Sequence, residues 1–252
     1  MQQDMIAFAK NLVLECGNKL REVSSVEAEY KTGIQDLVTE YDRMIEQYIH
    51  KKIQEQYPTH QFLGEEETKE MGDYLWILDP IDGTTNFVTM HRDFAISLAY
   101  YQKKKPVFGI VYDVMRDELF IGIHGKGAWL NDTKLEKLHR KKLSECVLEA
   151  GMSAISYMKE HFQYDLFDFQ KKIRAHRSYG CASLSIVHIA QGITDLYITS
   201  KAKCWDYAAA IIILEEVAGA YAIHNTFFTD ENTFCIFANQ KAWITQIEKG
   251  CL

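Results

Sequence analysis

Apolar positions recur at helical spacing in two segments near the start of the chain. Residues 4–22 carry an apolar stripe on one face, which predicts an amphipathic helix. We expect a second helix to begin near Thr39, because Thr39 can cap it and Asp42 follows three positions later. Pro58 marks the expected end of this helix.

The pattern then changes to short apolar runs of the β type, separated by polar turns. Strands are expected at residues 75–78, 95–101, 107–114 and 118–123. Two helices followed by such a meander indicate an α+β arrangement for this part of the chain.

In the remaining sequence, helical and strand patterns alternate, which favours an α/β arrangement. The expected helices cover 157–173, 182–190, 207–217 and 239–249, and the expected strands cover 195–199 and 234–237. We therefore predict an α/β protein with an N-terminal α+β half, residues 1–138, and a C-terminal α/β half, residues 139–252.

Composition narrows the class of protein. Of 252 residues, 47% are hydrophobic, which excludes disorder as the main state. The net charge of −7 disfavours direct nucleic-acid binding. The six cysteines form no CxxC pair and indicate buried thiols in a reducing compartment. The longest strongly apolar run, 207–214, is far shorter than a membrane span. We expect a cytoplasmic protein with no membrane association.

The densest chemical signal is Asp79-Pro80-Ile81-Asp82-Gly83-Thr84-Thr85-Asn86, directly after an apolar run. We expect Pro80 and Gly83 to end the strand and force a tight turn. That turn would gather two carboxylates, the Ile81 carbonyl and two hydroxyls, which are the hard oxygen ligands that Mg²⁺ or Ca²⁺ prefers. The alternative is that Asp79 and Asp82 only form Asx-turns.

Two further segments are weak signals alone. Gly64-Glu65-Glu66-Glu67 is typical of a solvated loop, although a glutamate there can complete a metal site beside a carboxylate turn. Cys204-Trp205-Asp206 opens an apolar helix, where Asp206 would also suit the positive end of the helix dipole without any further role.

Together these segments resemble the metal site of the inositol monophosphatase family, which belongs to the lithium-sensitive, magnesium-dependent phosphatases. The residues that carry the resemblance are Glu65, Asp79, Ile81, Asp82, Thr84 and Asp206, in the family's order along the chain. The resemblance implies a layered αβαβα sandwich, a homodimer, and hydrolysis of a phosphate monoester, with inositol 1-phosphate as the lead substrate.

The resemblance also implies roles for individual residues. The shell of a first Mg²⁺ would comprise Glu65, Asp79, the Ile81 carbonyl and Thr84, and that of a second would comprise Asp79, Asp82 and Asp206. A third, weaker ion would lie near Glu65. Asp42 and Thr84 match a pair that orients the nucleophilic water, and Gly83 and Thr85 match positions whose N–H groups point at the phosphate.

The sequence departs from the family pattern in the substrate pocket. Thr199 stands where these enzymes usually have a glutamate that binds ring hydroxyls, and the pocket segment reads Gly180-Cys181-Ala182. A hydroxyl is a weaker partner than a carboxylate, so we expect broad specificity.

Two alternatives remain open. Relatives with the same metal site act on fructose 1,6-bisphosphate, NADP or adenosine 3′,5′-bisphosphate, and the cations Arg177, Lys201 and Lys203 could hold a second phosphate. Some bacterial members instead regulate transcription or RNA processing through a protein partner, which the net charge does not exclude.

Overall fold

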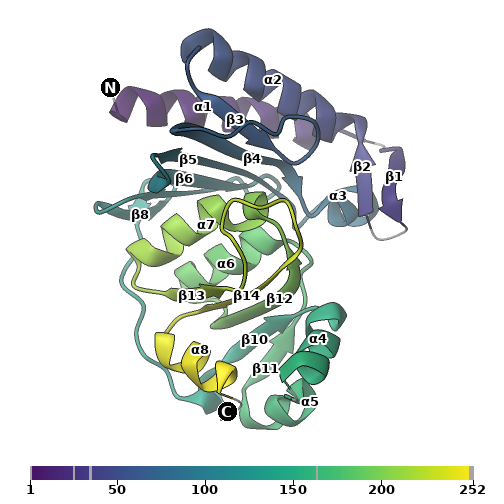
Figure 1. Cartoon of the computed structure of the whole chain (residues 1–252), viewed down its shortest axis with the longest axis vertical. Helices are drawn as coiled ribbons and strands as arrows, with labels where there is room; N and C mark the ends of the chain where they lie inside the picture. Colours follow the sequence, from purple (N-terminus) through teal and green to yellow (C-terminus); the bar gives the residue numbers. More distant parts are fainter. Residues whose placement is uncertain (1, 25, 34–35, 163, 250–252) are drawn as a thin grey trace.

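The structure is a computed structural model that describes residues 2–24, 26–33, 36–162 and 164–249. Two β-sheets alternate with three layers of helices in the order α–β–α–β–α (Figure 1). Helices α1 and α2 cover the outer face of the first sheet, and α6 and α7 lie between the sheets (Figure 1). The expected αβαβα sandwich is confirmed.

The first sheet has the strand order β3-β4-β5-β6-β7-β8-β9, antiparallel except for β3 and β4. Its strands are β3 (Gln61–Gly64), β4 (Tyr74–Asp82), β5 (Ala95–Gln102), β6 (Lys105–Asp113), β7 (Glu118–Ile123), β8 (Gly127–Leu130) and β9 (Thr133–Lys134). A separate hairpin joins β1 (Ala28–Gly33) to β2 (Asp36–Thr39).

Successive side chains of β4 point to opposite faces of the first sheet and belong to two different core clusters. Trp76 and Leu78 pack with α1 (Gln2–Arg21) and α2 (Glu40–Gln56) on the outer face. Leu75 and Ile77 pack on the inner face with α6 (Ala182–Gln191) and α7 (Cys204–Glu216). The strand is buried on both faces because helices cover both, so its sequence is a continuous apolar run.

The second sheet has the order β11-β10-β12-β14-β13. Its strands are β10 (Val147–Ala150), β11 (Ala175–Arg177), β12 (Leu196–Ala202), β13 (Ala220–Ile223) and β14 (Thr233–Ala238). The third core cluster lies on its outer face, beside α4 (Met152–Phe162), α5 (Leu166–Phe169) and α8 (Lys241–Glu248).

Several sequence predictions differ from the structure. The helix expected over 157–173 is wrong: α4 starts earlier and ends at Phe162, and Asp165 starts the short α5 by accepting a hydrogen bond from the N–H of Phe167 at 2.8 Å. The apolar pattern could not show this local cap. Helix α7 begins at Cys204, as the motif Cys204-Trp205-Asp206 indicates, and not at 207, where the apolar run begins. The sequence pattern does not predict the short strands β1, β2, β3, β8, β9, β11 and β13.

The connection between the sheets, residues 135–146, contains the predicted boundary between 1–138 and 139–252. That boundary stays a prediction, since α6 and α7 share one core with the first sheet. Among the helices that the structure describes, none has both the length and the apolar character needed to cross a membrane.

Helix α7 lies unusually close to the first sheet because β6 and β7 present glycines to it. A Cβ atom on Gly109 would stand 2.3 Å from the Ala209 carbonyl oxygen, and one on Gly122 would stand 2.7 Å from the backbone nitrogen of Ile213. Backbone atoms cannot move aside as a flexible side chain can, so both positions require glycine.

We predict that Gly109→Ala lowers the free energy of unfolding by about 1–3 kcal/mol, because the methyl group would push α7 away from β6. Thermal unfolding should show a fall in Tm of about 2–4 °C for each kcal/mol. Gly151→Ala is the matched control, since a Cβ there meets only Ser153 Oγ at 3.9 Å. Equal Tm values for the two variants would contradict the close packing of α7.

Candidate active site

The carboxylate turn begins inside β4, which continues to Asp82 and so extends beyond the strand expected over 75–78. The register with β5 shifts between Asp79 and Asp82, where Pro80 has no N–H to offer the ladder. Asp79 Oδ1 accepts a hydrogen bond from the N–H of Ile81 at 3.1 Å. Gly83 then adopts φ +89° and starts α3 (Thr84–Met90).

Glu65 is partly exposed and follows β3 in a loop that Glu46 holds in place. The buried Glu46 carboxylate accepts hydrogen bonds from the N–H groups of Glu66, Glu67 and Thr68 at 2.7–2.8 Å. The Lys69 ammonium donates to the Glu65 carbonyl at 2.8 Å. Sequence reasoning missed Glu46, although a glutamate on the apolar stripe of α2 was a usable signal.

Asp42 links α2 to the turn. Its Oδ2 accepts hydrogen bonds from the N–H and Oγ1 of Thr39 at 2.8 and 2.6 Å, which confirms the predicted capping box. Its Oδ1 lies 3.3 Å from Thr84 Oγ1, which also lies 3.0 Å from the Ile81 carbonyl. Asp42 is therefore buried within reach of the Thr84 hydroxyl.

Asp82 and Asp206 lie at the first turns of the two central helices. Asp82 accepts hydrogen bonds from the N–H groups of Ala182 and Ser183 at 3.1 and 2.5 Å, and Cys181 Sγ donates to it at 3.1 Å. Asp206 is partly exposed in α7 and accepts from the N–H of Lys203 at 2.9 Å. Both carboxylates face the positive ends of helix dipoles.

The aspartates from both halves share one electrostatic environment. Burial raises the pKa of Asp79 well above its usual range, and the charges of Glu65, Asp82 and Asp206 raise this pKa further. Burial also raises the pKa of Asp206, assisted by the charges of Asp82 and Glu65. For Asp82, burial raises the pKa while the hydrogen bonds from α6 oppose the shift.

The carboxylate oxygens of these residues are suitable ligands for a divalent cation. The negative charges of clustered carboxylates repel one another, and a cation between them would remove this repulsion. Within the described part of the chain, no three His, Cys, Asp or Glu side chains are already grouped as a metal site. Carboxylate oxygens are instead engaged by helix N–H groups, and Glu65 hydrogen bonds to Asp79. Binding would therefore require these side chains to rotate.

A cavity of about 310 Å³ opens beside Asp82 and Asp206. Of the predicted substrate residues, Gly180, Ala182 and Thr199 line it. Cys181 is buried behind the wall, whereas Gly83 and Thr85 lie at the start of α3 and are not among its lining residues. Asn86 links the two segments by donating to the Tyr179 carbonyl at 2.7 Å.

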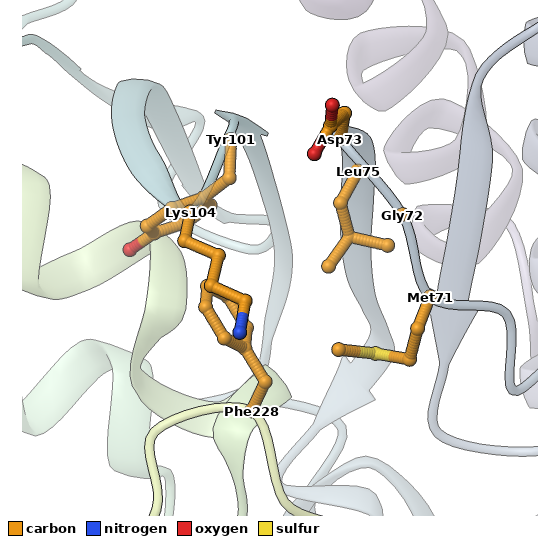
Figure 2. Close-up of a pocket in the computed structure, with 7 residues that line it drawn as sticks. All are labelled: Met71, Gly72, Asp73, Leu75, Tyr101, Lys104 and Phe228. Carbon is orange, nitrogen blue, oxygen red and sulfur yellow. The ribbon is translucent and has the colours of Figure 1, made fainter.

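A second cavity, of about 290 Å³, contains none of the predicted site residues (Figure 2). Figure 2 shows Met71 and Leu75 on one side of it and Lys104 and Phe228 on the other. Of the expected metal ligands, Asp82 and Asp206 line the first cavity.

The fold and the acidic cavity between the sheets define a class, the metal-dependent phosphatases built as αβαβα sandwiches. The model of the inositol monophosphatase family matches residues 1–247. The chain belongs to this family and is a phosphoric monoester hydrolase.

Individual relatives agree with this assignment. The chain is 37% identical over 220 residues to the inositol-1-monophosphatase of Bacillus subtilis, covering 85% of this chain and 83% of the relative. It is 33% identical over 220 residues to a fructose-1,6-bisphosphatase/inositol-1-monophosphatase of Thermotoga maritima, covering 86% and 83%. A crystal structure of an IMPase/NADP phosphatase complexed with Mg²⁺ and phosphate matches with a TM-score of 0.87 at 26% identity, covering 99% and 95%.

We predict that Asp79→Asn raises the Tm of the protein in EDTA at pH 7. Ionisation of Asp79 destabilises the folded state once the pH exceeds the unfolded pKa of about 3.9, because the folded pKa is higher. The gain should shrink as the pH falls and vanish below about pH 3, where both states hold the proton. Thermal unfolding at a series of pH values measures it.

Asp82→Asn is the control for this prediction. Its carboxylate accepts two N–H groups through two oxygens, and an amide keeps only one acceptor oxygen. The Asp82 variant should therefore gain less than the Asp79 variant. An Asp79→Asn protein less stable than the wild type at pH 7 in EDTA would contradict the electrostatic interpretation.

Proposed function

We propose that the chain hydrolyses inositol 1-phosphate as its lead substrate, with broad specificity, using two to three Mg²⁺ ions. The proposed ligands are Glu65, Asp79, the Ile81 carbonyl, Asp82, Thr84 and Asp206. The observation that carries the proposal is the shared electrostatic environment of Asp79, Asp82 and Asp206, which come from both halves of the chain.

When bound, the cations would lower the pKa of water and neutralise charge on the phosphate oxygens. The chain's own contribution is to orient that water. Thr84 Oγ1 has one hydrogen, which it can donate to the Ile81 carbonyl at 3.0 Å or to Asp42 Oδ1 at 3.3 Å. With the hydrogen on Asp42, the Thr84 lone pairs can accept a hydrogen bond from the water. We propose Glu65 as a further acceptor at the same water.

The proposed substrate contacts use both halves. The N–H groups of Gly83 and Thr85, at the start of α3, would bind the phosphate. Gly180, Cys181, Ala182, Thr199 and Asp206 would bind the alcohol part. Thr199 lies in the cavity wall and accepts a hydrogen bond from the N–H of Lys201 at 3.3 Å.

Hydrolysis of a bisphosphate or NADP is the second candidate, and Lys201 favours it. Of the three cations named from the sequence, Lys201 lines the cavity, whereas Lys203 Nζ lies 5.3 Å from the centre of the Trp205 ring and Arg177 donates to the His176 carbonyl. The names of two relatives include such activities.

Lys201→Met should then reduce turnover of fructose 1,6-bisphosphate or NADP more than that of inositol 1-phosphate.

We further propose a cytoplasmic homodimer without a nucleic-acid partner. The buried free thiols of Cys16, Cys146, Cys181, Cys204 and Cys235 support a reducing compartment. The homodimer rests on the family resemblance, and sedimentation of the purified chain would test it.

We predict strictly Mg²⁺-dependent turnover of p-nitrophenyl phosphate and inositol 1-phosphate that EDTA abolishes. Thr84→Ser keeps the hydroxyl and should retain most activity. Thr84→Val is close in shape to threonine and should lose about 10²–10⁴-fold in kcat. Full activity in EDTA would refute the metal-dependent reaction, and equal rates for the Ser and Val variants would refute the role of Thr84.

We predict that Thr199→Glu raises the preference for inositol 1-phosphate over glycerol 2-phosphate by about tenfold in kcat/KM. A charged acceptor forms a stronger hydrogen bond with a ring hydroxyl than a neutral one does. Thr199→Gln, of similar size but neutral, is the matched control and should change the ratio less. An unchanged ratio in the Glu variant would show that position 199 does not reach the ring.

A further inference from the structure

Glu149 is a buried acid that the proposed reaction does not use. It lies in β10 with 1% of its surface exposed, and it belongs to the wall of the cavity that contains Asp82. Its register partner on β12 is Tyr197. Its side chain contacts Ser185 of α6, so it lies on the sheet face that α6 covers. Sequence reasoning gave no sign of it, because its partners are far away in the chain.

The hydrogen bonds around Glu149 favour a proton on its carboxyl group. Ser185 Oγ makes a short hydrogen bond with Glu149 Oε1 and lies 2.6 Å from the Cys181 carbonyl oxygen. Two hydrogens are needed for these two contacts, but a serine hydroxyl has one and a carbonyl has none. A proton on Glu149 would supply the second hydrogen: Glu149 would then donate to Ser185, which in turn donates to Cys181.

The other oxygen of Glu149 agrees with a neutral acid. Among the described residues, buried Oε2 has no hydrogen-bond partner, and Oε1 receives only a long hydrogen bond of 3.4 Å from the N–H of Tyr179 besides its contact with Ser185. An ionised carboxylate left with an unpartnered buried oxygen would be costly. Burial raises the pKa of Glu149 to about 7, and the charge of Asp82 acts in the same direction.

This chain of hydrogen bonds ends at the segment that holds Asp82. Cys181 is the N-cap of α6, and its carbonyl also accepts from the N–H of Ser185 at 3.0 Å. The next two N–H groups, of Ala182 and Ser183, bind the two oxygens of Asp82. The position of the first turn of α6 therefore determines where the Asp82 carboxylate lies.

We propose that Glu149 is a positioning residue that acts as a neutral acid: through Ser185 and Cys181 it fixes the first turn of α6, and through that turn it orients Asp82 for the cation. The inference rests on the proposed function, because Asp82 is proposed there as a metal ligand. It differs from a catalytic role in that Glu149 needs its proton and its shape, not a negative charge.

The test compares Glu149→Gln, Glu149→Leu and Ser185→Ala by calorimetric titration with Mg²⁺ and by steady-state kinetics. Glutamine has the same shape and its amide N–H can donate to Ser185, so Mg²⁺ affinity should stay within about threefold of the wild type. The Leu and Ala variants should bind Mg²⁺ about tenfold more weakly. Circular dichroism confirms that each variant is folded. If Glu149→Leu does not fold, Ser185→Ala still tests the proposal.

The proton itself is observed without any activity measurement. At pH 6 the infrared spectrum of the wild type should contain a band of a neutral carboxyl group that the spectrum of the Glu149→Gln variant lacks. The difference between the two spectra isolates this band. Absence of this band would overturn the inference, as would a Gln variant as impaired as Leu or a Leu variant with unchanged Mg²⁺ affinity. A wild type that neither binds Mg²⁺ nor turns over substrate would refute the proposed function instead, and the infrared result would still decide the state of Glu149.

Discussion

The hydrogen bonds between Asp82 and the first turn of α6 join the two parts of the molecule at the point where its chemistry lies. Asp82 ends a strand of the first sheet, whereas α6 comes 100 residues later in the chain. A carboxylate this deeply buried is tolerated because two backbone N–H groups and the helix dipole face it. The same contact places the start of α6 beside the other aspartates, so the packing that joins the two parts of the molecule also forms the acidic cavity.

The central helices can take part only because the sheet lets them approach closely. Helix α7 is apolar on all sides and is buried between the two sheets. The helix backbone at Ala209 meets Gly109, and the backbone at Ile213 meets Gly122, with no room for a methyl group at either glycine. This close approach carries Asp206 to the carboxylates of β4, and their mutual repulsion is the electrostatic property that a divalent cation would relieve.

Two buried glutamates support the site in opposite ways. Glu46 accepts three backbone N–H groups and thereby holds the loop of Glu65. Glu149, with its proposed proton, instead donates to Ser185 and so fixes the first turn of α6. One buried acid thus supports the site as a hydrogen-bond acceptor and the other as a donor.

Local patterns were enough to predict both N-terminal helices, the Thr39–Asp42 capping box and the main strands, because those signals depend on neighbours within a few positions. They failed where a nearby side chain interrupts an apolar pattern, as Asp165 does after α4. Glu46 and Glu149 could not be assigned a role, because their partners lie 20 to 36 residues away and become neighbours only when strands and helices pack. The sequence by itself therefore determines which residue types could hold a cation. The burial that shifts their pKa values, and the hydrogen-bond donors that orient them, arise only from contacts between distant segments.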